Sequence, residues 1–163
     1  MTEELRAKAR KWPKGNHYED FKLGHVFQHH WGRSINEGDN SLFTTLTLSY
    51  NPLYFNNEYA RAHGHPGVKV NSMLVFLTVF GLSVEDLSEA GGLFLGVDDL
   101  TFEKPVYPGD TLFARSKVVD KRESSSRPDS GIVTWHTEGF NHRGERVIDF
   151  HRTNLVTKRG PAK

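Results

Sequence analysis

The sequence contains no cysteine among its 163 residues, so it offers no disulfide, no thiolate metal ligand and no cysteine nucleophile. It also lacks an excess of charge of either sign, because 21 lysines and arginines are matched by 20 aspartates and glutamates. Proteins that bind nucleic acid or anionic membranes through charge usually carry a basic excess, so neither partner is expected. The N-terminal residues contain no apolar run typical of a signal peptide, and we expect a cytoplasmic location.

The long apolar run from Met73 to Leu82 is too short to span a bilayer, which needs about 20 apolar residues. It instead predicts a helix over Val70 to Leu82 that is apolar all round. Such a helix belongs in a core, so we expect it to be buried on all sides. A side-chain oxygen of Asn71 or Ser72 can cap its first turn.

Four later segments alternate in polarity or are rich in β-branched and aromatic residues. They are Leu93 to Val106, Thr111 to Arg122, Gly131 to Asn141, and Glu145 to Thr157. Turn-like residues separate them, which predicts long antiparallel strands joined by hairpins. A twisted antiparallel sheet curled round one long apolar helix is the hot dog architecture, of the α+β class.

The segment before the helix predicts smaller elements. We expect a first strand over His25 to Trp31 and a short helix over Leu42 to Leu48, capped by Asp39 or Asn40. This helix would direct Leu42, Phe43 and Leu46 inward, and Asn56 to Ala62 would form another helical turn. The predicted organisation is a surface segment at 1–17, one hot dog domain at 18–158 and a tail at 159–163. An unpaired outer strand favours edge pairing, so we expect at least a homodimer.

Four motifs in order carry a family likeness. They are Phe43 to Asn56, Val70 to Met73, Pro105 to Leu112, and Lys121 to Pro128. Together they resemble MaoC-like hydratases and dehydratases, and the nearest branch is similar to the mesaconyl-CoA and itaconyl-CoA hydratases. The resemblance implies a hot dog dimer that adds water to, or removes it from, the α,β-double bond of a short, branched or dicarboxylic acyl-CoA. It implies no metal and no cofactor besides the CoA thioester.

In that family an acidic residue or Asn, and a His five positions later, do the acid–base work. Aligning Asn51-Pro52-Leu53 with the family segment places Ser49 at the first position and Tyr54 at the second. Neither side chain is an ordinary base at neutral pH. Tyr54 could act as an acid or as a hydrogen-bond donor to the enolate, while Ser49 or Asn51 positions water; alternatively, Tyr54 simply packs.

Other residues could supply the missing base. His63 or His65 could reach the site from the adjoining loop, although a loop histidine is usually only solvated. Their His-x-His spacing also suggests a metal site, but no third ligand is evident, and none is predicted. Asp39 or Glu37 could provide a carboxylate, although capping accounts for Asp39 equally well.

The helix entry and the basic residues complete the candidate site. Asn71-Ser72 resembles the helix entry of the branched-dicarboxylate branch. Asn71 could orient a substrate carboxylate or water, or it could only cap the helix. The resemblance also implies that a backbone N–H at the helix N-terminus, such as that of Ser72, holds the thioester carbonyl. Arg122 and Arg127 could meet CoA phosphates or a second carboxylate, or could equally be a charged hairpin, and Lys69 and Arg61 are further candidates for the phosphates.

The leading hypothesis is therefore a hydratase or dehydratase with an atypical acid–base pair, in which Tyr54 and Asn71 face a tunnel at the helix N-terminus. A second hypothesis is a catalytically silent hot dog subunit that binds acyl-CoA or supports an active partner. A third is a thioesterase on the same fold, which would need a carboxylate; the segment from Phe43 to Asn56 contains none, and Asp39 is the one that precedes it.

Overall fold

The computed structural model describes residues 14–160. Most of the predicted N-terminal surface segment and part of the C-terminal tail lie outside the described residues. The dominant element is a six-stranded antiparallel sheet in the order β1-β4-β5-β6-β3, in which β2 also pairs with β4. The strands are β1 (Val26–Gln28), β2 (Arg33–Ser34), β3 (Gly92–Phe102), β4 (Thr111–Glu123), β5 (Ser130–Asn141) and β6 (Arg146–Thr157).

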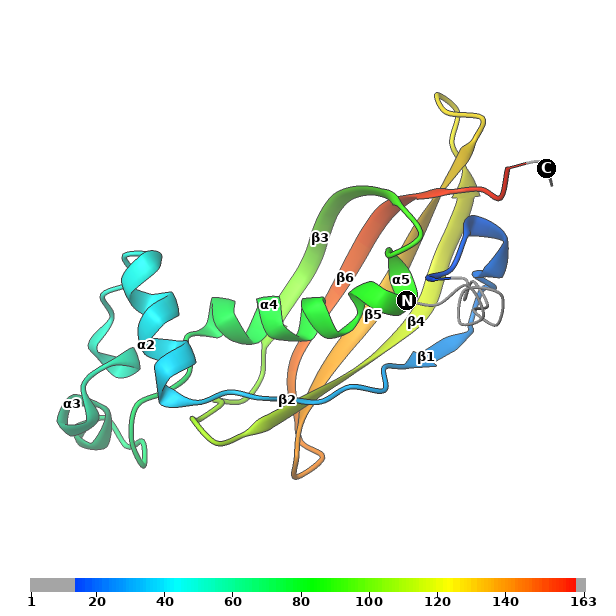
Figure 1. The fold of residues 1–163 in the computed structure, drawn as a ribbon. Coiled ribbons are helices and arrows are strands. Elements are labelled where there is room, and N and C mark those ends of the chain that lie inside the picture. Colours follow the sequence, from blue (N-terminus) through cyan, green and yellow to red (C-terminus); the bar gives the residue numbers. More distant parts are fainter. Residues whose placement is uncertain (1–13, 161–163) are drawn as a thin grey trace, which may run out of the picture.

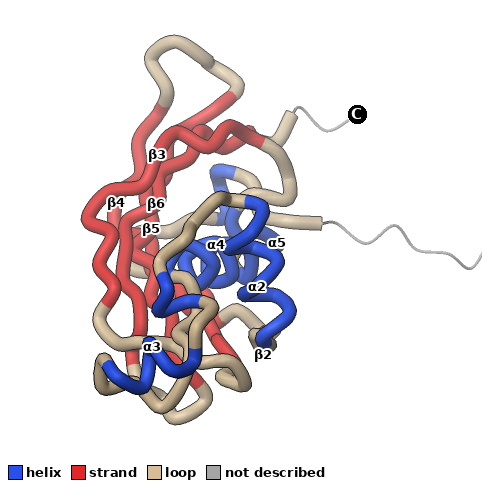
Figure 2. The backbone as a smooth tube through the Cα atoms, turned by 90° about the vertical axis from the view of Figure 1, so that its left-hand side faces the viewer, coloured by secondary structure: helices blue, strands red, loops and turns tan. Residues whose placement is uncertain are grey.

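The helices all lie on one side of this sheet (Figure 2). Helix α4 crosses the middle of the sheet, while α2 and α3 gather at one end of the molecule (Figure 1). The helical elements are α2 (Glu37–Leu46), α3 (Asn57–Ala62), α4 (Ser72–Leu82), α5 (Val84–Leu87) and the short 3-10 turns η1 (Tyr18–Asp20) and η2 (Pro52–Tyr54). The predicted α+β arrangement of an antiparallel sheet around a central helix is confirmed.

The sheet face toward α4 is apolar because side chains alternate along each strand. On β4, Leu112 and Ala114 are buried in the same core cluster as Val75 and Val79 of α4, and their neighbours Phe113 and Arg115 are exposed. A Cβ placed on Gly139 of β5 would lie 2.6 Å from Val79 of α4, so the glycine allows the helix to approach the sheet closely. Burial of these apolar side chains is the main driving force that holds α4 in place.

Helix α4 begins as expected but is less buried than expected. Asn71 is its N-cap, because its side-chain oxygen accepts from the Met73 amide at 2.9 Å. Val75 and Val79 are buried against the sheet, whereas Met73 is 46% and Leu77 48% exposed. The prediction of burial on all sides is therefore wrong for the single chain, because the sheet covers one side of the helix and leaves an apolar stripe uncovered on the other.

Helix α2 also departs from prediction. It begins at Glu37 and is capped by Asn36, not by Asp39 or Asn40. Asn36 and Asp39 form a reciprocal capping box, with bonds of 2.9 and 3.0 Å. Its inner side holds the polar residues Asn40 and Thr44, whereas the leucines predicted to point inward, Leu42 and Leu46, are 61% and 73% exposed. The inward positions are polar because Asn40 bonds to three backbone groups of neighbouring segments.

Smaller differences occur at strand ends. Strand β3 ends at Phe102 instead of continuing to Val106, because Pro105 has no N–H and the Val106 carbonyl accepts from Val70 at 2.9 Å. The first strand is shorter than predicted and spans Val26–Gln28. The short elements β2 and α5 were not predicted, since two and four residues are too few to show a period.

Arg152 of β6 is buried at the far end of α4. Its guanidinium donates to Ser83, Ser88 and Asn154 at 3.0, 2.7 and 3.0 Å, and lies 4.0 Å from the centre of the Phe80 ring. Burial lowers the pKa of Arg152 to about 10. Ser83 is the C-cap residue of α4, so the cation sits at the negative end of the helix dipole.

Candidate functional site

The N-terminus of α4 is the centre of the candidate site. The Asn71 side-chain amide donates to Ser49 Oγ at 3.0 Å, while its oxygen caps the Met73 amide. Asn71 is 3% exposed and Ser49 is half-buried. Because Ser49 Oγ accepts from Asn71, its own proton remains directed elsewhere and can bond to a water or a substrate oxygen.

Asn40 is a buried residue that links the segments around this site. Its side-chain nitrogen donates to the carbonyls of Tyr54 and Lys69 at 2.8 and 3.0 Å, and its oxygen accepts from the Asn71 amide at 2.8 Å. It therefore joins α2, η2 and the entry to α4. Sequence reasoning considered Asn40 only as a helix cap, because the three backbone partners lie 14 or more positions away.

The segment from Ser49 to Tyr54 lies beside α4 and is held by its own caps. Asn51 caps η2 by accepting from the Leu53 amide at 3.1 Å, so its side-chain nitrogen is left to contact water. Tyr54 is half-buried, and its backbone is fixed through Asn40. Ser49 is therefore bonded directly to Asn71. Tyr54 is linked to Asn71 indirectly, because Asn40 bonds to the backbone of both residues. The roles of these four predicted residues in catalysis stay a prediction.

A cavity of about 190 Å³ opens at the start of α4. Its lining is Lys69, Val70, Ser72, Val75, Phe102, Glu103, Lys104, Pro105 and Val106. Two predicted substrate-binding residues, Lys69 and Ser72, are therefore brought together. The lining includes neither Tyr54 nor Asn71, so a single tunnel shared by both stays a prediction.

The two predicted loop arginines lie elsewhere. Arg122 is near the end of β4 and Arg127 is in the following hairpin, where its amide donates to Ser124 Oγ at 3.2 Å. This hairpin lies at the opposite end of the molecule from α2 and α3 (Figures 1 and 2). Within one chain, these arginines are not brought to Ser49 or Asn71.

The two loop histidines have local partners. His63 Nδ1 lies 2.8 Å from the Tyr59 carbonyl at the end of α3, and the two rings stack at 4.0 Å. His65 Nδ1 lies 3.0 Å from the Tyr107 hydroxyl. Burial and the nearby Asp110 raise the pKa of Tyr107. Both histidines therefore have partners within their own loop and its neighbours, and their use as a catalytic base stays a prediction.

The candidate carboxylates also have local partners. Asp39 completes the capping box of α2 and pairs with Arg33 at 3.3 Å, so its carboxylate already has two partners, and its use as a base stays a prediction. Arg61 pairs with Glu58 at 2.6 Å. Glu37 and Arg61 line a separate cavity of about 290 Å³.

The family-like segment from Pro105 to Leu112 forms a structural turn. Asp110 is 4% exposed, accepts from the Tyr107 amide at 3.0 Å and pairs with Arg143 at 2.8 Å. Gly109 has φ +97°, a conformation that favours glycine, and its amide donates to the Ile35 carbonyl at 2.7 Å. This turn fixes β4 beside β2 and so supports the part of the sheet against which α4 packs.

Sequence reasoning missed a buried chain of polar side chains. His29 Nδ1 lies 2.6 Å from Asp86, and its Nε2 lies 2.9 Å from Ser116 Oγ, which in turn bonds to Thr137 at 2.8 Å. The order of groups resembles a hydrolytic triad, but Ser116 is 0% exposed and cannot meet a substrate. Burial lowers the pKa of His29, although the bond to Asp86 opposes this. This row of hydrogen-bonded side chains links α5 to the sheet.

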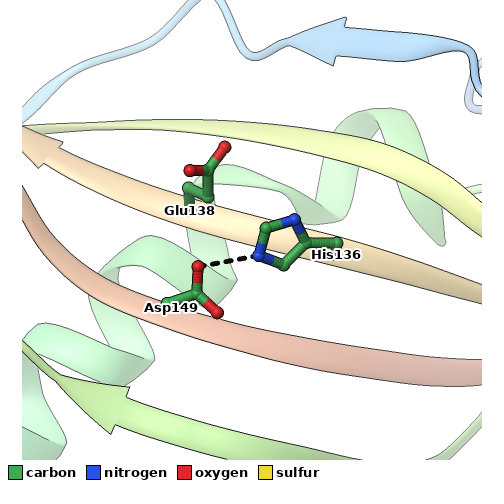
Figure 3. A group of neighbouring side chains, drawn as sticks. All are labelled: His136, Glu138 and Asp149. Atoms are coloured by element: carbon green, nitrogen blue, oxygen red, sulfur yellow. Dashed lines mark hydrogen bonds and ion pairs between the residues drawn. The ribbon is translucent and has the colours of Figure 1, made fainter.

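A second polar cluster lies on the outer side of the sheet, away from α4. Figure 3 shows His136, Glu138 and Asp149 together on β5 and β6, with His136 Nε2 2.7 Å from Asp149. Arg146 bonds to both carboxylates at 3.0 Å. Hydrogen bonds from Arg115 and Arg146 lower the pKa of Glu138, although burial of this carboxylate acts in the opposite direction. The carboxylates already have cationic partners, so the cluster is an ion-pair network rather than a ligand set awaiting a metal.

Solved structures with the same arrangement define the fold class. A MaoC domain protein from Chloroflexus aurantiacus J-10-fl has a TM-score of 0.87 and 36% sequence identity, covering 95% of this chain and 44% of that chain. A Mycobacterium tuberculosis protein with a double hot dog fold has a TM-score of 0.78 and 23% identity, covering 91% and 46%. The architecture is the hot dog fold, as predicted.

Sequence comparison then identifies the family. The model for mesaconyl-CoA hydratase matches residues 2–163. The mesaconyl-CoA hydratase of Haloarcula marismortui is 40% identical over 150 residues, which are 91% of this chain and 42% of the relative. The chain belongs to the mesaconyl-CoA hydratase family, which confirms the predicted MaoC-like resemblance. It spans less than half the length of the mesaconyl-CoA hydratases that it matches.

None of the helices within residues 14–160 combines the length and the apolar character that a bilayer span requires.

Proposed function

We propose that this chain hydrates the α,β-double bond of a short, branched dicarboxylic acyl-CoA, or catalyses the reverse dehydration, with no cofactor besides the CoA thioester. The observation that carries the proposal is the family match over residues 2–163. Mesaconyl-CoA, named in that family, is an unsaturated branched dicarboxylic thioester. Because the chain covers only 42% of the length of the Haloarcula marismortui relative, its activity does not follow from family membership alone and is proposed here.

The proposed mechanism assigns a role to each group near α4. Water adds its oxygen to the β-carbon, a proton reaches the α-carbon, and negative charge passes through the thioester oxygen. The N-terminus of α4, with the Ser72 amide, would stabilise that charge. Ser49, held by Asn71 at 3.0 Å, and the amide of Asn51 would position the water. Tyr54 would supply the proton to the α-carbon and regain the one that the added water loses; alternatively, it would bond to the enolate oxygen while the proton of water passes to the α-carbon.

A second candidate function is a silent subunit that binds acyl-CoA and supports an active partner. The observation that favours it is the residue pair itself, since Ser49 and Tyr54 stand where the family segment carries a carboxylate or Asn and a His. In this case the purified protein would bind acyl-CoA without turnover. Stable association with a related chain that carries the usual pair would support it.

The assembly also belongs to the proposal. The stripe of Met73 and Leu77 on α4 continues toward Trp31, which is 62% exposed. A cavity of about 570 Å³ follows this stripe. We propose that a second copy covers it, since exposed apolar surfaces of this kind commonly mark protein contacts.

The activity is tested by following the absorbance of the conjugated thioester when purified protein meets mesaconyl-CoA, itaconyl-CoA and crotonyl-CoA. A faster loss of absorbance with mesaconyl-CoA than with crotonyl-CoA supports the proposed hydratase. Binding without loss of absorbance supports the silent subunit. Absence of both binding and turnover contradicts both functions.

A further inference from the structure

The cavity at the start of α4 is lined by a lysine that pairs with no carboxylate among residues 14–160. Two lysines line it, but they differ in their partners. Lys104 Nζ lies 2.7 Å from Glu145, whereas Lys69 forms no ion pair with any residue in the range 14–160. The ion pair with Lys104, together with hydrogen bonds from Asn141 and Arg143, lowers the pKa of Glu145 to about 2.

The acidic residue of the lining does not neutralise Lys69 either. Glu103 pairs with Arg146 at 2.5 Å on the outer side of the sheet. The carboxylate in the cavity wall and the second lysine therefore both have partners outside the cavity. Lys69 is a half-buried residue of the lining, and its cation has no carboxylate partner in the part of the chain that the structure describes, so it can meet a ligand.

The rest of the lining has the chemistry of a short acyl site. Its lining is mixed: the apolar members are Val70, Val75, Phe102, Pro105 and Val106, and Ser72 is a polar neighbour of the charged residues. Its volume of about 190 Å³ suits a small branched acyl group but not the nucleotide of CoA. Sites for drug-sized ligands are larger, at about 300–1,000 Å³.

We infer that this cavity receives the free carboxylate of a dicarboxylic acyl-CoA and that Lys69 is the residue that selects it. The inference rests on the proposed function and extends it by naming the specificity determinant. An ammonium beside a carboxylate forms a charge-assisted hydrogen bond, which an acyl group without that carboxylate cannot form. A CoA phosphate would use the same chemistry, so the test must separate the two sources.

Calorimetric binding of saturated, unreactive thioesters separates them. Methylsuccinyl-CoA carries the carboxylate and butyryl-CoA lacks it, while both carry all the phosphates of CoA. We expect Lys69→Met to raise the Kd of methylsuccinyl-CoA roughly ten-fold and to leave the Kd of butyryl-CoA unchanged. Lys69→Arg keeps the cation and should retain the preference. The matched control is Lys104→Met, which removes a lysine already paired and should alter neither Kd.

Three results would overturn the inference. Equal weakening of both thioesters by Lys69→Met would assign the lysine to a phosphate, an unchanged Kd for both would give it no ligand role, and failure of the wild-type protein to bind methylsuccinyl-CoA would leave the cavity without this ligand. The thermal midpoint of each variant checks that the fold is intact. Wild-type binding with the expected Lys69 effect but no turnover of mesaconyl-CoA would contradict the proposed activity alone.

Discussion

The carboxylate of Asp86 lies 2.6 Å from Nδ1 of His29, and this contact joins α5 to the sheet through a buried imidazole. Burial lowers the pKa of His29 in the folded protein, while the unfolded chain takes up a proton near ~6.5. Below that pH the unfolded state binds more protons than the folded state. The free energy of unfolding should therefore fall as the pH decreases from 7 to 5, and it should recover when the pH is brought back to 7.

Urea unfolding at a series of pH values measures this dependence. His29→Gln should destabilise the protein at pH 7 and flatten the slope below about 6.5, because the titrating group is gone. The control is His63→Gln, which changes an exposed histidine at the end of α3 and should leave the slope intact. A slope in His29→Gln equal to that of the wild type would assign the pH dependence to other groups.

Asn40 should be the costliest polar residue of the site to remove. Asn40→Ala leaves two carbonyls and one amide without their partner, and we expect a loss of about 3 kcal/mol in the free energy of unfolding, since an unsatisfied buried group costs about 1–3 kcal/mol. Asn56→Ala removes one exposed cap bond to Tyr59 and should cost only about 1 kcal/mol. Equal losses in chemical denaturation would contradict the linking role of Asn40.

Tyr54→Phe tests the atypical acid–base pair. Removal of a general acid should lower kcat on the order of 100-fold, while the thermal midpoint stays near that of the wild type. Ser49→Ala should lower kcat by about ten-fold, because it removes one water-positioning bond worth about 0.5–1.5 kcal/mol. Turnover untouched by both changes would direct attention to His63, His65 and Asp39.

Leu77→Asp tests the proposed contact between copies. The side chain is 48% exposed in one chain, so a charge there should leave the monomer folded but disrupt a covering subunit. Sedimentation should show a shift toward monomer at fixed protein concentration. The control is Leu23→Asp, which changes a 65% exposed leucine outside α4 and should keep the wild-type assembly. A wild-type protein that is already monomeric would contradict the proposal.

The sheet and α4 could be predicted because their signals are local. The strand predicted from Gly131 to Asn141 differs by one residue from β5, and the apolar run marked α4 within two residues of its start. Partial exposure of Leu77 could not be predicted, since an apolar run does not say how many sides its neighbours cover.

The candidate site was predictable only in part. Ser49, Asn71 and Tyr54 came from resemblance, and the structure adds the bond between Ser49 and Asn71. Asn40 and the pair of His29 with Asp86 depend on contacts between positions far apart in the chain, which leave no period or motif in the sequence.

The buried Arg152 has a consequence for behaviour on heating. Hydration of a charged group becomes less favourable as temperature rises, so the penalty for keeping this guanidinium away from water shrinks. Its bonds to Ser83 and Ser88 remain in place meanwhile. The junction of α4 with β6 should therefore carry a growing share of the protein's resistance to unfolding in warm conditions.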